Sequence, residues 1–120
     1  MRKLPVIGFV LVVVLFFACT KKTPEEVVKR YYTHFFKGEY DKLQDFVVEE
    51  QREGFALMNE LIPPKEREKS AREKVEVSNV KCKILSDTVA ICSCLLKVGK
   101  KEAKNENIRL RKVGKSWLVD

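Results

Sequence analysis

Residues 75–98 read VEVSNVKCKILSDTVAICSCLLKV, and this stretch decides the class of fold. Apolar side chains alternate with polar ones from Val75 to Ile84, and this two-residue period predicts a β-strand with one buried face. The phase of the alternation slips at Ser78-Asn79, which indicates a β-bulge. The stretch therefore begins with a strand that bends.

Three further strands are expected after this one. Residues 89–98 are apolar on both faces, which is typical of a central strand. In the strand that follows, Ile108 and Leu110 face inward, and Gly114-Lys115 fits a two-residue hairpin turn. We expect an antiparallel sheet of about four strands, over 75–84, 89–98, 103–113 and 116–120.

The chain before the sheet carries the signals of a helix. Thr23 suits the N-cap, Pro24 suits the first helical position, and Glu26 completes a capping box. Gly38 is expected to end the helix. The apolar side chains between these ends recur at steps of three and four and form one broad face, made of Val27, Val28, Tyr31, Tyr32, Phe35 and Phe36.

Two shorter helices are expected next, over about 39–47 and 50–62, and Pro63-Pro64 ends the second of them. Residues 65–74 are almost wholly charged with alternating signs, so they form either a solvated helical turn or a loop. Helices that precede an antiparallel sheet predict an α+β domain, with the N-terminal helices packed on the sheet.

The beginning of the chain has the pattern of an export signal. It is positively charged, and its apolar run over 4–18 is shorter than the roughly 20 residues that a membrane-spanning helix needs. Residues 16–19, FFAC, resemble the lipobox of bacterial lipoproteins, in which the cysteine, here Cys19, receives a diacylglycerol through a thioether. We therefore expect a lipoprotein signal peptide over 1–18, a lipidated tether over 19–22 and a single domain over 23–120. An uncleaved membrane anchor is the alternative.

The charge is basic and uneven. The formal net charge is +7 at pH 7, and residues 79–120 hold ten basic and four acidic side chains. A basic surface can bind nucleic acid, but an exported protein meets little of it. The alternatives are a solvated face and contact with anionic lipid headgroups. We expect no nucleic-acid partner and no cofactor.

Acylation of Cys19 leaves Cys82, Cys92 and Cys94. A turn over 86–88 would place Cys82 opposite Cys92, and Cys94 shares that face because side chains alternate along a strand. Three thiols in an oxidising compartment favour one disulfide, from Cys82 to either of the other two, with buried free thiols as the alternative. A zinc site would need a fourth ligand, so no metal is expected.

Four short pieces of the chain resemble one group of bacterial proteins. They read TPEEVV at 23–28, GEYDKL at 38–43, DTVAI at 87–91 and GKSWLVD at 114–120. These pieces are similar to short lipoproteins of the nuclear-transport-factor-2-like (cystatin-like) superfamily, some of which are lumazine-binding-like domains of unknown function. The resemblance implies a curved antiparallel sheet wrapped around a long first helix, with a cone-shaped cavity.

The resemblance also implies that an enzyme of this superfamily would place a catalytic pair, either Asp–His or Tyr–Asp, in its pocket. His34 is the only histidine, so it cannot build a multi-histidine metal site or a relay. Asp41 and Asp45 share an exposed helix face by their spacing, which is typical of solvated acids. We expect His34 to be a partly exposed structural residue and the domain to have no catalytic residues, whereas a buried His34 bonded to either acid would favour an enzyme.

Aromatic side chains are the candidate ligand surface. An aromatic stripe on a helix usually packs a core, but aromatic walls with a few polar tips also suit a small-ligand pocket. The candidate pocket residues are Tyr31, Tyr32, Phe35 and Trp117.

Three functional hypotheses follow. The first is a non-catalytic module that binds a small ligand or a protein, tethered to the lipid bilayer of the bacterial cell envelope through acylated Cys19 and expected on the outer membrane facing the periplasm. The second is a structural accessory subunit, which forms a homodimer through its sheet or binds another envelope protein. The third is an enzyme with a cone-shaped pocket.

Overall fold

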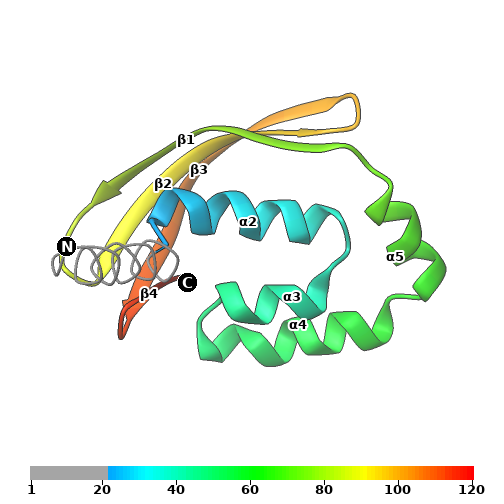
Figure 1. Cartoon of the computed structure of the whole chain (residues 1–120), viewed down its shortest axis with the longest axis horizontal. Helices are drawn as coiled ribbons and strands as arrows, with labels where there is room; N and C mark the ends of the chain where they lie inside the picture. Colours follow the sequence, from blue (N-terminus) through cyan, green and yellow to red (C-terminus); the bar gives the residue numbers. More distant parts are fainter. Residues whose placement is uncertain (1–21) are drawn as a thin grey trace, which may run out of the picture.

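The computed structural model describes residues 22–120, in which four helices precede a four-stranded antiparallel sheet (Figure 1). The strands follow the order β1-β2-β3-β4, and the sheet does not close. The predicted α+β class is therefore confirmed. The helices are α2 (Pro24–Phe36), α3 (Tyr40–Leu43), α4 (Glu49–Leu61) and α5 (Pro64–Ala71), and the strands are β1 (Val75–Ile84), β2 (Val89–Val98), β3 (Lys101–Val113) and β4 (Ser116–Val119).

Helix α2 begins and ends where the sequence predicts. The Glu26 N–H donates a hydrogen bond of 3.2 Å to Thr23 Oγ1, and Pro24 stands in the first turn, where its missing N–H leaves no bond unmade. The last helical residue is Phe36, and Gly38 follows with φ +73°. The chain can therefore turn sharply into α3.

The helix expected over 39–47 is broken by its tertiary contacts. A short 3-10 turn over Gln44–Phe46 follows α3, and the backbone is extended at Val47. The Val48 N–H donates to the Val119 carbonyl of β4 at 3.0 Å, and Val47 forms a parallel bridge to the same residue. Both valines are buried, so the chain leaves the helix to extend the sheet.

Helices α4 and α5 correspond to the predictions for residues 50–62 and 65–74. Helix α4 matches the helix expected over 50–62 to within one residue at each end. Helix α5 shows that the charged segment over 65–74 takes its helical alternative, with Pro64 as the first helical residue. None of the residues of α5 is buried, as alternating charge indicates.

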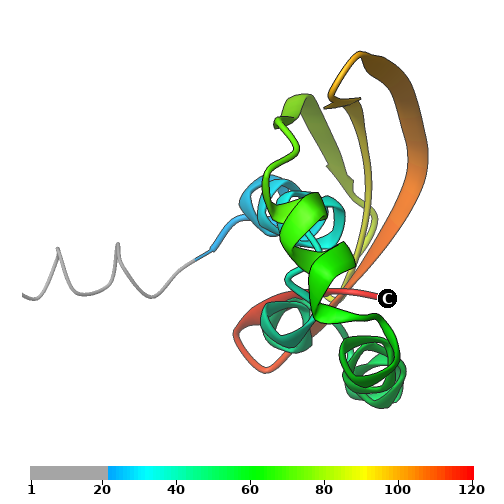
Figure 2. The ribbon, with the colours of Figure 1, turned by 90° about the vertical axis from the view of Figure 1, so that its right-hand side faces the viewer.

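The sheet contains two irregularities, one of which the sequence predicts. The register of β1 against β2 shifts around Asn79, which has φ +50°. The register of β2 against β3 shifts between Cys92 and Cys94, close to Asn107 with φ +58°. Bulges increase the local twist of a sheet, and the strands curve around the helices (Figure 2).

Strand β2 is central, as predicted, but residues 22–120 cover only one of its faces. Its inward residues are buried, whereas Ile91 and Leu95 on the outer face are partly exposed. The helices all lie on the concave side of the sheet (Figure 2). Residues 22–120 therefore place no layer on the outer face.

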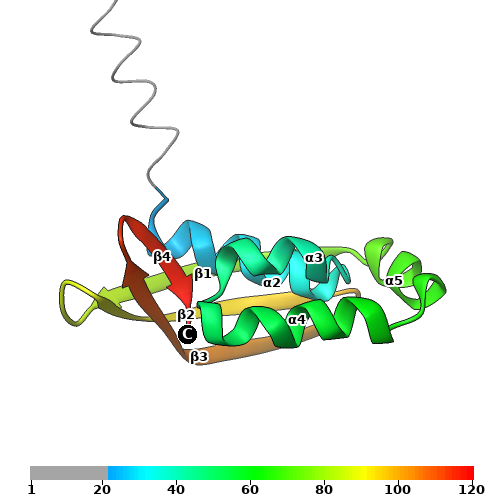
Figure 3. The same cartoon turned by 90° about the horizontal axis from the view of Figure 1, so that it is seen from below.

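The core lies between α2 and the concave face of the sheet. Val27 and Val28 of α2 are buried, as are the inward-facing Ile108 and Leu110 of β3. Helix α5 lies at the end of the molecule opposite the hairpin between β3 and β4 (Figure 3). Among residues 22–120, no helix has the length and apolar character needed to cross a bilayer.

Candidate functional site

An open cleft of about 730 Å³ lies at the end of the sheet where β2 turns into β3. This volume falls within the range of small-ligand pockets, roughly 300–1,000 Å³. Apolar side chains from the end of α2 and from the β2–β3 hairpin form its walls, and charged residues complete its lining. The cleft is lined by Phe36, Leu96, Val98, Gly99 and Ala103, together with Glu73, Lys100 and Lys101.

The hairpin between β2 and β3 reaches beyond the end of α2 (Figure 1). Gly99 turns the hairpin with φ +62°, and its N–H donates to the Lys74 carbonyl at 2.9 Å. A Cβ atom at this position would lie 3.1 Å from a carboxylate oxygen of Glu73. The tip is thus fastened to the segment that enters β1, which keeps the cleft in shape.

A partly buried polar pair, Tyr32 and Asn105, adjoins residues that line the cleft. Asn105 Nδ2 donates to Tyr32 Oη at 2.6 Å, and the Tyr32 ring stacks on Phe36 with centroids 6.2 Å apart. Asn105 is two residues beyond Ala103, so both side chains lie on the concave face. Among the hydrogen bonds of residues 22–120, the one from Asn105 is the only one that involves the phenol oxygen. The Tyr32 hydroxyl accepts in that bond, so its own O–H can donate to a ligand.

Burial raises the pKa of Tyr32 to about 12, with further upward contributions from Tyr31 and Cys94 and an opposing one from the Asn105 hydrogen bond. Burial also raises the pKa of Tyr31. Both phenols therefore stay protonated at neutral pH, and Tyr32 can donate a hydrogen bond but cannot act as a base.

The structure places the predicted pocket residues in two separate regions. Tyr31 and Phe35 pack edge-to-face on Phe55 of α4, with centroids 6.2 and 6.4 Å from it. They join α4 to α2 rather than line the cleft. None of the four predicted residues lines this cleft, whereas Phe36, one turn after Tyr32, does so because it lies at the end of the helix.

Trp117 lies far from this cleft. It lines a small hollow of about 150 Å³ with Lys22 and Phe46, and the Lys112 ammonium lies 5.7 Å from its ring centroid. The ring is partly buried against the core. Trp117 is therefore a core-flanking residue near the start of the domain.

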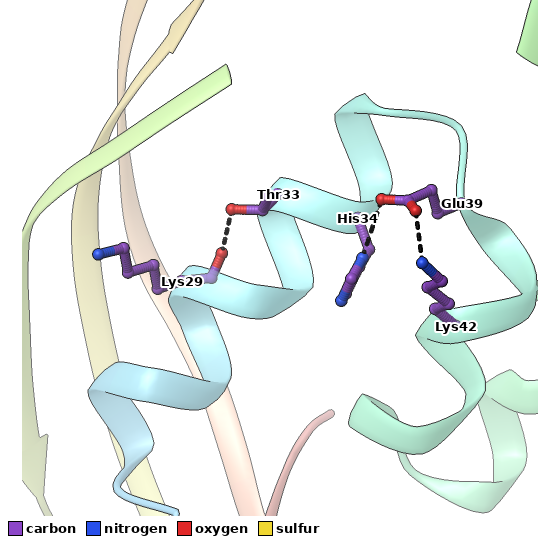
Figure 4. A network of polar contacts seen from close by, with 5 residues as sticks. All are labelled: Lys29, Thr33, His34, Glu39 and Lys42. Carbon is purple, nitrogen blue, oxygen red and sulfur yellow. Dashed lines mark hydrogen bonds and ion pairs between the residues drawn. The ribbon is translucent and has the colours of Figure 1, made fainter. Parts of the chain in front are cut away.

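His34 belongs to a polar network at the turn between α2 and α3 (Figure 4). Its Nδ1 lies 3.1 Å from one carboxylate oxygen of Glu39, and Lys42 Nζ donates to the other oxygen at 2.7 Å. The hydrogen bond from Lys42, followed by that with His34, lowers the pKa of Glu39. Asp41 and Asp45 are exposed, and neither is the partner of His34.

This network fixes the turn. The His34 ring also packs on Phe46, with centroids 5.6 Å apart, and 23 % of its side chain is exposed. A nearby backbone carbonyl, that of Lys29, accepts a hydrogen bond of 2.7 Å from Thr33 Oγ1 (Figure 4). The contacts of His34 are those of a partly exposed structural residue.

The structure joins Cys82 to Cys92 in a disulfide, which is one of the two pairings that the sequence left open. The two residues face each other across β1 and β2. Cys94 is buried with a free thiol, and burial raises its pKa. Within residues 22–120, no cluster of three or more His, Cys, Asp or Glu side chains could hold a metal ion.

The sequence pattern did not indicate most of the cleft residues. Leu96 and Val98 read as ordinary strand residues, and Glu73 lies in the charged segment. One signal was available. The inward positions of β3 change from Ile108 and Leu110 to Ala103 and Asn105, and small or polar residues on a core-facing strand indicate that the core ends there.

Cys19 and the signal peptide over 1–18 lie outside the described residues. Comparison with known proteins supplies no relative. The chain matches no protein-family model, no curated protein and no solved structure. Any functional assignment therefore depends on the residues and on the geometry of the cleft.

Proposed function

We propose that the mature protein is a lipoprotein of the bacterial cell envelope, anchored through Cys19, whose domain binds a small, largely apolar ligand without catalysis. The anchor rests on the sequence FFAC at 16–19, and the observation that carries ligand binding is the open cleft at the end of the sheet. Phe36, Leu96 and Val98 would contact the apolar body of the ligand. A few polar groups beside apolar walls are typical of sites that orient a ligand.

The polar end of the ligand has two possible partners. Lys100 and Lys101 contribute positive charge to the cleft, and Glu73 contributes the opposite charge. The Tyr32 phenol, whose ring stacks on the cleft residue Phe36, can donate a hydrogen bond. We therefore expect a ligand with an apolar body and an anionic or hydrogen-bond-accepting end.

The finer description of the fold belongs to the same proposal. We infer a nuclear-transport-factor-2-like cone, in which the first helix crosses the concave face of a curved sheet. Two features support it: α2 lies along that face, and the cleft occupies the place where the sheet extends beyond the helix. The sheet is open, with β1 and β4 at its two edges, so the cone is not closed.

A dimer through the outer face of the sheet is less well supported. Ile91 on that face is paired with Lys83 on one side and Arg109 on the other, and Leu95 is paired with Lys104. A two-fold interface would bring such lysines close to their own copies, and like charges in an interface are costly.

Mass spectrometry of the native protein extracted from membranes tests the proposal. We expect an acyl group on Cys19 and a co-purified small molecule. Binding can be measured independently with an anionic apolar fluorophore, 1-anilinonaphthalene-8-sulfonate, using Ala103→Phe to fill the cleft. Ala103 is exposed, so this change should leave the core intact.

Ala71→Phe, on exposed α5, is the matched control. We expect Ala103→Phe to weaken fluorophore binding several-fold and to remove the co-purified molecule, while the control retains both. Equal binding by the two variants, with no co-purified molecule in the wild type, would overturn the cleft as a ligand site.

A further inference from the structure

The start of the described chain and two β-hairpins lie at one end of the molecule (Figures 1 and 3). Lys22 lines the same hollow as Lys115 of the β3–β4 hairpin. The Lys112 N–H donates to the Thr88 carbonyl at 2.8 Å, which joins that hairpin to the one between β1 and β2. We call this surface, from Lys22 across residues 112–115 to residues 83–88, the tether-side end.

The tether-side end exposes large apolar side chains. Ile84 and Leu85 are 55 % and 56 % exposed at the β1–β2 hairpin, and Val113 is 50 % exposed at the neighbouring hairpin. Single exposed apolar residues are ordinary on a protein surface, but a group of them at two adjoining hairpins indicates a contact surface. Ile84 and Val113 are the last residues of β1 and β3, and Leu85 follows Ile84, and their exposure shows that the core does not cover these three side chains.

Lysines surround these apolar side chains. Lys83, Lys112 and Lys115 are exposed, and none of them belongs to an ion pair within residues 22–120. The acidic residues nearby are Asp87, in the β1–β2 turn, and Asp45, which lines the hollow beside Lys22. The positive charge of this end is therefore largely free to act on a partner.

We propose that the tether-side end rests on an anionic phospholipid surface. Ile84, Leu85 and Val113 enter the headgroup region, and the lysines bind lipid phosphates while their aliphatic stems cover the apolar side chains. This inference relies on the lipid anchor at Cys19. The tether over 19–22 spans at most roughly 14 Å when extended, so this end is held beside the bilayer.

Docking in this orientation has a functional consequence. The cleft lies at the opposite end of the molecule, beside the β2–β3 hairpin (Figure 1). The docked domain thus points its cleft away from the bilayer, so the ligand arrives from the aqueous compartment rather than from the lipid.

Lysine modification tests the docking on the full mature protein. The protein is reconstituted in vesicles of phosphatidylcholine, with or without phosphatidylglycerol, and its lysines are acetylated and located by mass spectrometry. We expect several-fold slower acetylation of Lys83, Lys112 and Lys115 on the anionic vesicles, and loss of this protection at high salt. Lys65 and Lys69 of α5 should react equally in all conditions. Equal protection on both kinds of vesicle, or protection of no lysine, would overturn the proposal.

A second measurement tests the apolar contact. In a Trp117→Phe background, Leu85→Trp places the only tryptophan at the tether-side end, and Leu61→Trp places it on α4 as the matched control. Both leucines are more than half exposed, so neither change should disturb the core. Brominated lipids should quench the first reporter and spare the second. Quenching of both or of neither would contradict docking through this end.

The mass of the intact protein separates this inference from the proposed anchor. If Cys19 carries no acyl group, the anchor is wrong, and the protein is added to the same vesicles from solution. The same protection and quenching would then support a docking surface that acts alone, and their absence would refute it. Neither measurement depends on the cleft.

Discussion

Trp117 is only partly buried, but we expect it to contribute strongly to the stability of the domain. Its ring packs against the core from β4 but keeps one side toward Lys112. Truncation of a buried tryptophan costs about 3–5 kcal/mol, and we expect Trp117→Ala to cost about 3 kcal/mol because the ring is only partly buried. Urea unfolding followed by circular dichroism measures the change, and Trp117→Phe should be milder. A loss of less than about 1 kcal/mol would show that the ring contributes little packing.

Glu39 makes the unfolding free energy of the domain depend on pH in the acidic range. Lys42 and His34 lower its folded pKa below the ordinary value of 4.5, so its contribution is complete above that pH and is lost as the pH falls through the lower folded value. We expect Glu39→Gln to flatten the acidic limb of a plot of unfolding free energy against pH. Glu53→Gln, on an exposed part of α4, is the control. Parallel acidic limbs for wild type and Glu39→Gln would contradict the network.

The cysteines give a chemical test of the pairing between β1 and β2. Protein matured in the envelope and denatured without reductant should have one free thiol that reacts with an alkylating reagent. That thiol is Cys94, because Cys82 and Cys92 form the disulfide and Cys19 is expected to carry lipid. Peptide mapping by mass spectrometry identifies it. Alkylation of all three cysteines would show that the disulfide does not form in the cell.

The turn between α2 and α3 is an element that depends on one glycine. Gly38 has φ +73°, and a Cβ atom there would lie 3.2 Å from the Cβ of Ser70 on α5. Gly114 has a similar φ of +63° but open space around it. Each change to alanine should cost about 1–2 kcal/mol for the left-handed backbone. Gly38→Ala should cost more, because α5 must also move. Equal losses in thermal unfolding would show that the α5 contact carries no energy.

At the scale of the whole molecule, the expected lipid anchor decides where the domain works. We expect Cys19→Ala to move the protein from the membrane pellet to the supernatant in a high-salt wash, which screens the attraction of the lysines to lipid. Each buried methylene of an acyl chain contributes about 0.8 kcal/mol of anchoring, so loss of the chains should release the protein. Fractionation and measurement of the intact mass check both points. If wild type and Cys19→Ala pellet equally, and their intact masses differ only by the substituted side chain, Cys19 is not lipidated.

Local signals in the sequence were sufficient for most elements. The α2 cap, the helical period and the alternation in β1 each arise from neighbours within one or two turns of chain, so the residues alone specify them. The bulge at Asn79 is equally local, because it changes the phase of the alternation. The opposition of Cys82 and Cys92 follows from the short turn between their strands.

Contacts between distant residues decided the remainder. The helix expected over 39–47 breaks because Val48 bonds to Val119, more than 70 positions later, and a local pattern carries no record of that partner. The cleft depends on where α2 ends relative to the β2–β3 hairpin, so Phe36 lines it and Tyr31 does not. The sequence by itself determined the class of fold, its caps and its strand period, since these depend on near neighbours. Only the tertiary structure decided which aromatic ring reaches the cleft and which apolar turns share one end, since both depend on how separate elements pack.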